Sequence, residues 1–364
     1  MNFTAFVGSY TDESLAGIHI LDVDASAGAM RPLGILRGIE NPTYLAVNRA
    51  GTRLYTVRGL TPGAAPETNG AVAAYAIEGA TLTLLNCCAT RATIPCYLAL
   101  DLAERTLVYA EYAQGHAGAF ALNDDGSIDA TSEVAVQHTG RGPNPLRQER
   151  AHAHCAEVTP DGRWLCVCDL GLDQVVVYDL ADWRRGLRAR PELAIRTAPG
   201  AGPRQLRFHP NGRLVFLLNE LDSTVLSLRY TGAAFETVDT LSALPDGFDG
   251  ESKAAAVRVS PDGRFLFTSN RGHDSLATFA VDTATGRIRR LAISPLSGRF
   301  PRDFNVVPDG NWLLVGHKRS DELVLYAFDR TSGRIEPRGP TYPMHHPTCV
   351  VFHPARPTIP EAGA

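Results

Sequence analysis

Four segments of the chain repeat one pattern: TPDGRWLCVCDL (159–170), HPNGRLVFLLNEL (209–221), SPDGRFLFTSNR (260–271) and VPDGNWLLVGHK (307–318). Their turn glycines, Gly162, Gly212, Gly263 and Gly310, are 50, 51 and 47 residues apart. In each copy an apolar strand runs into a Pro-Asp-Gly or Pro-Asn-Gly turn, and a second apolar strand follows directly. A period near 50 residues in an all-β chain is typical of propeller blades.

Further copies bring the number of repeats to seven. A weaker copy surrounds Gly51, and LDLAERTLVYAEY (100–112) lacks the turn glycine and has Glu104 there. The last copy, HPTCVVFHP (346–354), has no second strand, but FTAFVGSY (3–10) resembles one. We therefore predict an all-β fold: a seven-bladed β-propeller of four-stranded antiparallel blades, closed by pairing of the N-terminal and C-terminal strands. The prediction is one domain over residues 1–364, about 52 residues per blade.

Composition narrows the classes of function. With 35 Lys+Arg against 39 Asp+Glu the net charge is −4, which argues against nucleic-acid or membrane binding by bulk charge. The start, MNFTAFVGSYTDES, does not resemble a secretory signal, and the seven cysteines are typical of a reducing compartment. We expect a cytoplasmic protein that is a monomer or a weak homo-oligomer.

The antiparallel hairpins predict where function lies. The start of each first strand lies beside the end of the second, at the mouth of the channel opposite the turns. The pairs expected there are Tyr44 with Arg58, Tyr97 with Glu111, His154 with Asp169, Arg204 with Glu220, Ala255 with Arg271, Arg302 with Lys318, and Thr348 with Tyr10. The irregular stretches 59–70, 138–151 and 244–253 are expected to form long loops on this face.

Cations outnumber acids among these positions. Arg58, Arg204, Arg271, Arg302 and Lys318 stand against Glu111, Asp169 and Glu220. A cationic pocket predicts a small anionic ligand, a carboxylate or a phosphate. A base that activates water, a cation for the oxyanion and an acid for the leaving alkoxide suffice for ester or lactone hydrolysis. Any single Glu–Arg pair could equally be a structural ion pair.

Other motifs predict less. His152 and His154 could bind a metal, but no carboxylate-rich set accompanies them in the sequence. We therefore expect neither a metal nor another cofactor, and we expect the activity to survive chelation. His345 and His346 are interpreted as loop residues. The chain contains no G-x-S-x-G elbow, P-loop or dinucleotide fingerprint.

The repeated segments resemble those of the seven-bladed propeller lactonases, which include bacterial 6-phosphogluconolactonase and fungal carboxy-cis,cis-muconate cyclase. The resemblance covers nearly the whole chain and is most specific in GAGPRQLRFHPNGRLVFLLNELDSTV and VRVSPDGRFLFTSNRGHDSL. It implies a catalytic set of His154, Arg204, Glu220 and Arg271, with either Glu220 or His154 as the base. Two positions depart from the family pattern: Gln205, where relatives have histidine, and Ala256, where they often have an acid.

The leading hypothesis is a 6-phosphogluconolactonase-like hydrolase of an anionic sugar-acid lactone. Its expected substrate-binding residues are Arg302, Lys318, Arg58, Tyr44, Tyr10 and Asp169. Two alternatives remain: a carboxymuconate-type lactonising cyclase, and a non-catalytic propeller that binds a ligand or a protein.

Overall fold

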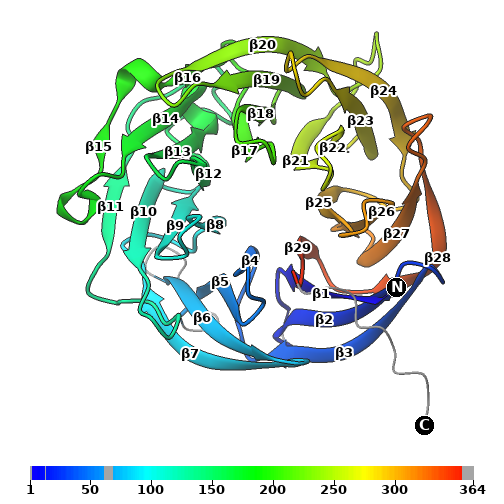
Figure 1. Cartoon of the computed structure of the whole chain (residues 1–364), viewed down its shortest axis with the longest axis horizontal. Coiled ribbons are helices and arrows are strands. Elements are labelled where there is room, and N and C mark those ends of the chain that lie inside the picture. The colour runs from blue at the N-terminus through cyan, green and yellow to red at the C-terminus, as the bar shows by residue number, and fades with distance from the viewer. Residues whose placement is uncertain (1, 13, 61–68, 355–364) are drawn as a thin grey trace.

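The computed structural model describes residues 2–12, 14–60 and 69–354. Seven antiparallel sheets follow one another around a central axis (Figure 1). The first four, from inside to outside, are β29 (Pro347–Phe352), β1 (Asn2–Ser9), β2 (Ala16–Asp24), β3 (Ala29–Arg37); β4 (Leu45–Val47), β5 (Arg53–Gly59), β6 (Gly70–Glu78), β7 (Thr81–Ala89); β8 (Tyr97–Leu100), β9 (Thr106–Glu111), β10 (His116–Ala121), β11 (Val134–Gln137); and β12 (Ala153–Val158), β13 (Trp164–Asp169), β14 (Gln174–Asp179), with β15 (Arg188–Ala189) and β16 (Ile195–Arg196) both paired to β14.

The remaining three sheets keep the same order. They are β17 (Pro203–Phe208), β18 (Leu214–Asn219), β19 (Thr224–Tyr230), β20 (Phe235–Ser242); β21 (Lys253–Val259), β22 (Phe265–Arg271), β23 (Ser275–Val281), β24 (Ile288–Pro295); and β25 (Pro301–Val306), β26 (Trp312–His317), β27 (Glu322–Phe328), β28 (Ile335–Pro343). Three short 3-10 helices, η2 (Leu170–Leu172), η3 (Trp183–Arg185) and η4 (Pro191–Leu193), lie around the fourth sheet. The predicted seven-bladed propeller is confirmed.

The repeated turns form as the sequence predicts. Gly162, Gly212, Gly263 and Gly310 all have φ between 68° and 77°, a region that glycine enters without a steric penalty. Each glycine N–H bonds back to the residue three positions earlier, as in Gly162 N to Thr159 O at 2.8 Å. These turns lie at one end of the channel, which we call the turn mouth. The other end, where the inner strands begin, we call the site mouth.

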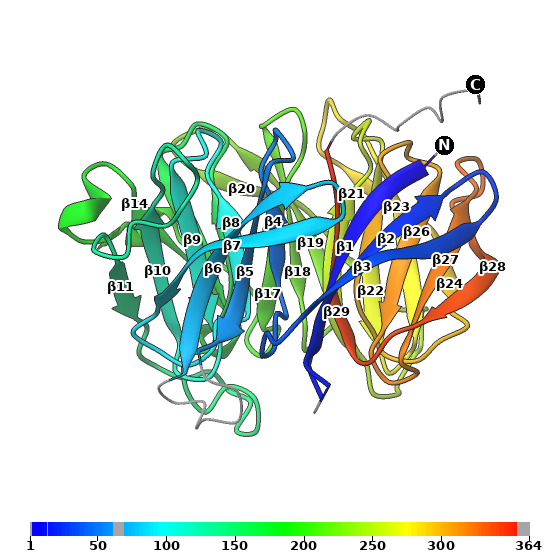
Figure 2. The ribbon, with the colours of Figure 1, turned by 90° about the horizontal axis from the view of Figure 1, so that it is seen from below.

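The ring closes through a pairing of the two ends of the described chain. Strand β29 is the innermost strand of the first blade and pairs antiparallel with β1, with Phe6 opposite Val351 and Val7 opposite Val350. Figure 2 shows these strands side by side in the side view. The pairing leaves the first blade with four strands like its neighbours, so the predicted closure is confirmed.

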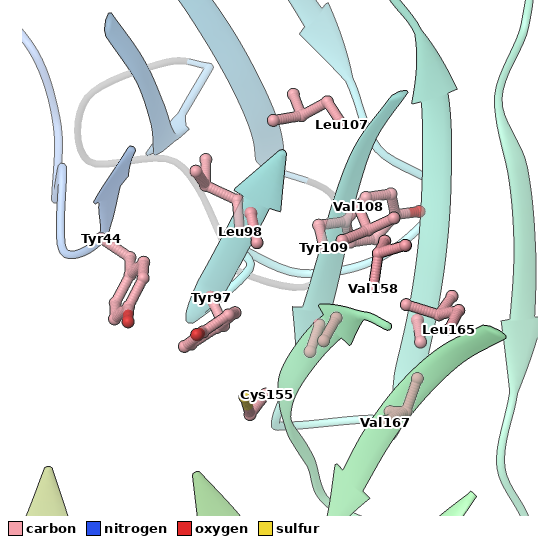
Figure 3. Close-up of a cluster of buried hydrophobic side chains, with 14 of the residues drawn as sticks. Tyr44, Tyr97, Leu98, Leu107, Val108, Tyr109, Cys155, Val158, Leu165 and Val167 are labelled. Atoms are coloured by element: carbon pink, nitrogen blue, oxygen red, sulfur yellow. The ribbon is translucent and has the colours of Figure 1, made fainter. Parts of the chain in front are cut away.

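Apolar side chains fill the space between the blades. One buried cluster includes Leu98, Val108, Leu165 and Val167 from the third and fourth blades, as Figure 3 shows. Each fully buried aliphatic side chain stabilises the fold by about 1.5–3 kcal/mol. Because every blade packs against two neighbours, the inner strands are held rigidly enough to present side chains at fixed positions around the channel.

Candidate active site

Extra residues in the inner strands build the site mouth. The pairing of the inner strand with its neighbour shifts register between Ala153 and Cys155, between Pro203 and Gln205, and between Pro301 and Asp303. The residues skipped by these shifts are His154, Arg204 and Arg302. A β-bulge bends its strand and re-aims the extra side chain, and such bulges are common beside active sites. Three blades thus use one backbone device to present a functional side chain.

A second repeated device anchors the chain just before two of these bulges, those at Arg204 and Arg302, and also before Thr348. In three blades the aspartate of the turn after the second strand accepts a hydrogen bond from the next blade: Asp173 from Gly202 N, Asp274 from Phe300 N, and Asp321 from His346 N, each at 2.8 Å. We call this contact the interblade clamp. The clamped residues have φ of 66°, 62° and 39°. They lie two residues before Arg204, Arg302 and Thr348, so the clamp sets where those residues enter the mouth.

Glu220 is the centre of the charged cluster. Its Oε2 lies 2.8 Å from Arg204 Nε and 2.8 Å from Arg271 Nη2, and its Oε1 accepts from Arg147 Nη2 at 2.5 Å. The carboxylate is only 4% exposed. Burial acts to raise the pKa of Glu220, but Arg271, Arg204 and Arg147 together outweigh it and hold that pKa well below its ordinary value. Glu220 is therefore ionised and weakly basic.

His154 is the uncharged partner in the cluster. Its imidazole is buried, and its Nδ1 has no hydrogen-bond partner among the described residues. Burial, then the positive charge of Arg204, hold the pKa of His154 well below its ordinary value against the opposing effect of Glu220. Tyr112 meets the ring edge-on at 5.6 Å between centroids. His154 is neutral at pH 7 and retains an unused nitrogen lone pair or N–H at the mouth.

A second group of cations, Arg302 and Lys318, lies near the arginines that surround Glu220. Arg302 Nη2 donates to Tyr10 Oη at 3.1 Å, and Lys318 Nζ lies 4.5 Å from the centroid of the Tyr10 ring. Burial lowers the pKa of Lys318, and the charges of Arg302, Arg319 and Arg271 lower it further. Among the described residues neither Arg302 nor Lys318 forms an ion pair with a carboxylate. The mouth therefore has an excess of positive charge that suits an anionic ligand.

Three of the expected substrate-binding residues are placed elsewhere. Asp169 accepts from His138 Nδ1, directly after the third blade, at 2.6 Å and from His152 N, directly before the fourth, at 2.8 Å. Arg58 donates to Gly59 O at 2.8 Å and interacts with Tyr75. Neither contacts the Glu220 cluster, so their assignment to the mouth is not supported.

Tyr44 also lies outside the cluster, deeper in the channel. Its hydroxyl accepts from Arg207 Nη2 at 2.8 Å, and its ring lies 4.1 Å from that of Tyr97. Figure 3 shows the two tyrosines side by side from neighbouring blades. Arg207 also pairs with Glu157, which accepts from the Tyr97 hydroxyl. These residues form a belt of paired polar groups below the site mouth.

A shift of one residue explains these differences. Glu220, Arg271 and Lys318 each follow their turn glycine by eight residues, but Arg58 and Asp169 follow theirs by seven. Because successive strand residues point to opposite sides, a one-residue offset turns a side chain from the mouth into the blade. Asn270, another residue seven positions after its glycine, likewise points away from the mouth: its amide donates to Ser275 Oγ in its own blade and to Ala243 O, which directly follows the preceding blade. Tyr44 similarly precedes Gly51 by seven residues, whereas Arg204 precedes Gly212 by eight.

Two residues of the cluster were not predicted from the sequence. Arg147 reaches Glu220 from the stretch 138–151, and Tyr112 accepts from Arg147 Nη2 at 3.2 Å. The stretch was expected to be a loop on the functional face, which its contact with Glu220 confirms, but nothing in the sequence singles out Arg147 from Arg141 and Arg150. Of the other two predicted loops, residues 61–68 lie outside the described residues, and Lys253, at the end of 244–253, accepts through its carbonyl from Arg271 Nε at 3.1 Å.

The two departures from the family pattern lie beside the cluster. Gln205 Oε1 accepts from Val257 N and from Arg258 Nη1, both at 3.2 Å, one residue deeper than Arg204. Ala256 is buried, and its N–H donates to Ser269 Oγ at 3.1 Å. Gln205 therefore occupies the floor of the site and keeps its amide oxygen engaged there.

The turn mouth contains a cavity of about 360 Å³, lined by residues including Glu157, Arg207, Arg49, Glu104 and Asn305. Both of its cations are paired with acids, Arg207 with Glu157 and Arg49 with Glu104. At the site mouth, by contrast, Arg302 and Lys318 have no carboxylate partner among the described residues, so electrostatics favours that end as the place where an anion reacts.

None of the helices within residues 2–12, 14–60 and 69–354 is long and apolar enough to cross a bilayer.

Comparison with known proteins identifies the family. Residues 4–352 match the family model described as "Lactonase, 7-bladed beta-propeller". The chain is 34% identical over 306 residues to 6-phosphogluconolactonase of Bacillus subtilis, covering 83% of this chain and 84% of that protein. It is 36% identical over 303 residues to an uncharacterized protein of Lactococcus lactis, covering 82% and 84%.

A solved structure adds a second named activity. The periplasmic gluconolactonase of Pseudomonas aeruginosa is 31% identical, superposes with a TM-score of 0.89, and is matched over 97% of this chain and 99% of that one. The family match and this superposition agree with the ring of blades and with the resemblance noted in the sequence. The chain belongs to the seven-bladed β-propeller lactonase family.

Proposed function

We propose that the protein is a lactone hydrolase of the 6-phosphogluconolactonase type, acting on an anionic sugar-acid lactone. The observation that carries the proposal is a neutral, buried His154 beside a buried arginine–Glu220 cluster and two cations that have no acid partner within the described part of the chain. Named relatives include a 6-phosphogluconolactonase and a gluconolactonase, which supports the substrate class. The proposed partner is thus a small anionic lactone or carboxylate rather than a nucleic acid or a membrane.

The two groups of cations at the mouth would bind two different parts of the substrate. Arg302 and Lys318, with the Tyr10 hydroxyl, would bind the anionic group of the lactone. The ring would then lie towards Arg204 and Arg271, whose guanidiniums stabilise negative charge that develops on the carbonyl oxygen. Glu220 keeps these two guanidiniums in place and limits their mutual repulsion.

His154 is the better candidate for the base. In this mechanism it removes a proton from a water molecule as the oxygen of that water attacks the lactone carbonyl carbon. The tetrahedral oxyanion then collapses, the ring C–O bond breaks, and the imidazolium returns the proton to the leaving alkoxide. The product is a hydroxy acid, which ionises and releases one proton to solvent. Glu220 is less suited to this role because both of its carboxylate oxygens already contact arginines, whereas His154 Nδ1 has no hydrogen-bond partner among the described residues.

Acid release measured at constant pH tests the proposal. The substrates are 6-phosphogluconolactone, gluconolactone and a carboxymuconolactone, each corrected for spontaneous hydrolysis. We expect His154→Asn to lower kcat by about 10²–10⁴-fold. Wild-type kcat should remain constant through neutral pH and fall only in the acid range, where His154 becomes protonated. Full activity in both His154→Asn and Glu220→Gln would contradict the site assignment.

The same assay separates the alternatives. A muconate-type cyclase would interconvert carboxymuconolactone and its open acid, and would leave the two sugar lactones at their spontaneous rates. A binding propeller would show no turnover of any of the three compounds, although a calorimetric titration could still detect binding of a carboxylate. Chelation with EDTA tests the expectation that catalysis needs no metal.

A further inference from the structure

A cluster of metal-ligand side chains lies on the rim of the site mouth, outside the machinery proposed above. Asp321 is in the turn between β26 and β27, and His345 and His346 directly precede β29. One donor atom from each of the three lies within 4.8 Å of the others. Asp321 Oδ1 is 3.7 Å from His345 Nδ1 and 3.8 Å from His346 Nε2. Only the fold brings these residues together, because they come from two different blades.

The backbone holds the cluster in place. Asp321 Oδ1 accepts the interblade clamp bond from His346 N at 2.8 Å, and Asp321 O accepts from Met344 N at 2.9 Å. His346 has φ of 39°, and the two imidazoles stack with centroids 4.0 Å apart instead of alternating as on a regular strand. The clamp occurs in other blades too, so the fold orients this carboxylate without help from an ion. Oδ2 makes no hydrogen bond to any residue that the structure describes.

We propose that Asp321, His345 and His346 form a binding site for Zn²⁺. Two imidazole nitrogens and one carboxylate oxygen are a donor set that zinc prefers, and three protein ligands leave the fourth tetrahedral position open to water or to a ligand. Tetrahedral Zn²⁺ places its ligand atoms about 3.4 Å apart. The two distances from Asp321 Oδ1 to the imidazoles must therefore shorten by about 0.3–0.4 Å, and no separation in the cluster must shorten by more than about 1.4 Å. All three side chains are 38–51% exposed, which leaves them free to make this rotation.

The surroundings supply both a further acid and a connection to the mouth. The Asp12 carboxylate interacts electrostatically with both His345 and His346. Tyr10 N donates to His346 O at 3.1 Å, and the Tyr10 ring lies against Lys318 and Arg302. A zinc ion bound here would lie at the edge of the substrate-binding cations, not among the residues that move protons.

Cobalt(II) substitution tests the site without an activity assay. The full chain, treated with chelator and then titrated with Co²⁺, should develop the visible absorption of tetrahedral cobalt, saturate at one ion per chain, and lose the band when Zn²⁺ is added. Asp321→Asn keeps the oxygen that accepts from His346 N but loses the anionic ligand. His346→Asn places at this position a residue that adopts the same backbone conformation at Asn41, where φ is 47°.

Each variant should weaken Co²⁺ binding by about tenfold or more. His273→Gln is the matched control, because His273 also lies in a turn on this face, where its Nδ1 hydrogen-bonds to Ser275 Oγ at 2.7 Å, and it is not part of the proposed ligand set. Circular dichroism and thermal unfolding check that both variants remain folded. Wild-type affinity in both Asp321→Asn and His346→Asn, or binding that does not saturate at one ion per chain, would overturn the proposal.

Discussion

Arg147 is a cation that reaches the site from a loop instead of a blade. Its guanidinium contacts both Glu220 and Tyr112, and its side chain is 26% exposed, so it is the member of the cluster most able to turn towards a ligand. We expect Arg147→Ala to lower kcat/KM for an anionic lactone by about 10–100-fold, mainly through KM, since a charged hydrogen bond contributes about 1.5–3 kcal/mol. Steady-state kinetics measure this. Arg150→Ala is the control, because Arg150 is 62% exposed and pairs with Glu149; an equal loss in both variants would refute a specific role for Arg147.

Glu220 connects the site to the stability of the fold. Its pKa in the folded protein is below the ordinary value, so its ionisation stabilises the fold above the ordinary glutamate pKa, and this contribution is lost as pH falls through the folded-state pKa. Glu220→Gln leaves the arginines without their anion, and we expect a loss of about 3–5 kcal/mol at pH 7. Urea unfolding should show that the difference from wild type shrinks in the acid range. A difference independent of pH would mean that the charge of Glu220 does not stabilise the fold. Glu149→Gln, at a residue 44% exposed, should have little effect at either pH.

At the scale of elements, the interblade clamp is the contact that couples a turn to the next bulge. Asp274 Oδ1 holds Phe300 N, and the Phe300 ring lies 5.3 Å from the Arg271 guanidinium and 4.2 Å from that of Arg319. Asp274→Ala leaves a strained backbone without its partner, so we expect a loss of about 1–3 kcal/mol in stability and a higher KM. Thermal unfolding and kinetics measure the two effects. Asp274→Asn, which keeps an acceptor oxygen, should restore both; failure of this rescue would show that the hydrogen bond is not what positions the bulge.

The strand patterns allow much of this architecture to be predicted, and the errors share one cause. The repeat spacing identifies seven blades and the closing pair β29–β1, because turns and alternation are local properties of the chain. It also brings His154, Arg204, Glu220 and Arg271 together correctly. Tyr44, Arg58 and Asp169 are misplaced because bulges and turn lengths change the side to which a residue points, and a single sequence does not reveal a bulge.

The sequence does not predict Arg147 as a site residue, and the reason is different. The loop that carries it is held by long-range contacts: Gln148 Nε2 donates to Leu170 O at 2.8 Å and to Asp173 Oδ1 at 2.7 Å. Those partners are more than twenty residues away in the sequence. The conformation of the loop, and hence the choice among its arginines, is decided by tertiary structure and not by any periodicity.

At the scale of the whole molecule, the distribution of charge matters more than its sum. The chain has a net charge of −4, yet Arg302 and Lys318, which form no ion pair with a carboxylate among the described residues, lie near Arg204 and Arg271 at one mouth of the channel. If the field at this mouth controls the encounter with substrate, kcat/KM for 6-phosphogluconolactone should fall about three- to tenfold from low to physiological ionic strength, because salt screens the attraction. If the net charge controlled it instead, added salt would raise kcat/KM. For uncharged gluconolactone, kcat/KM should not depend on ionic strength. Lys318→Gln should reduce the dependence of kcat/KM on salt for the phosphorylated lactone. Stopped-flow or initial-rate measurements over a salt series distinguish control by the local field from control by the net charge.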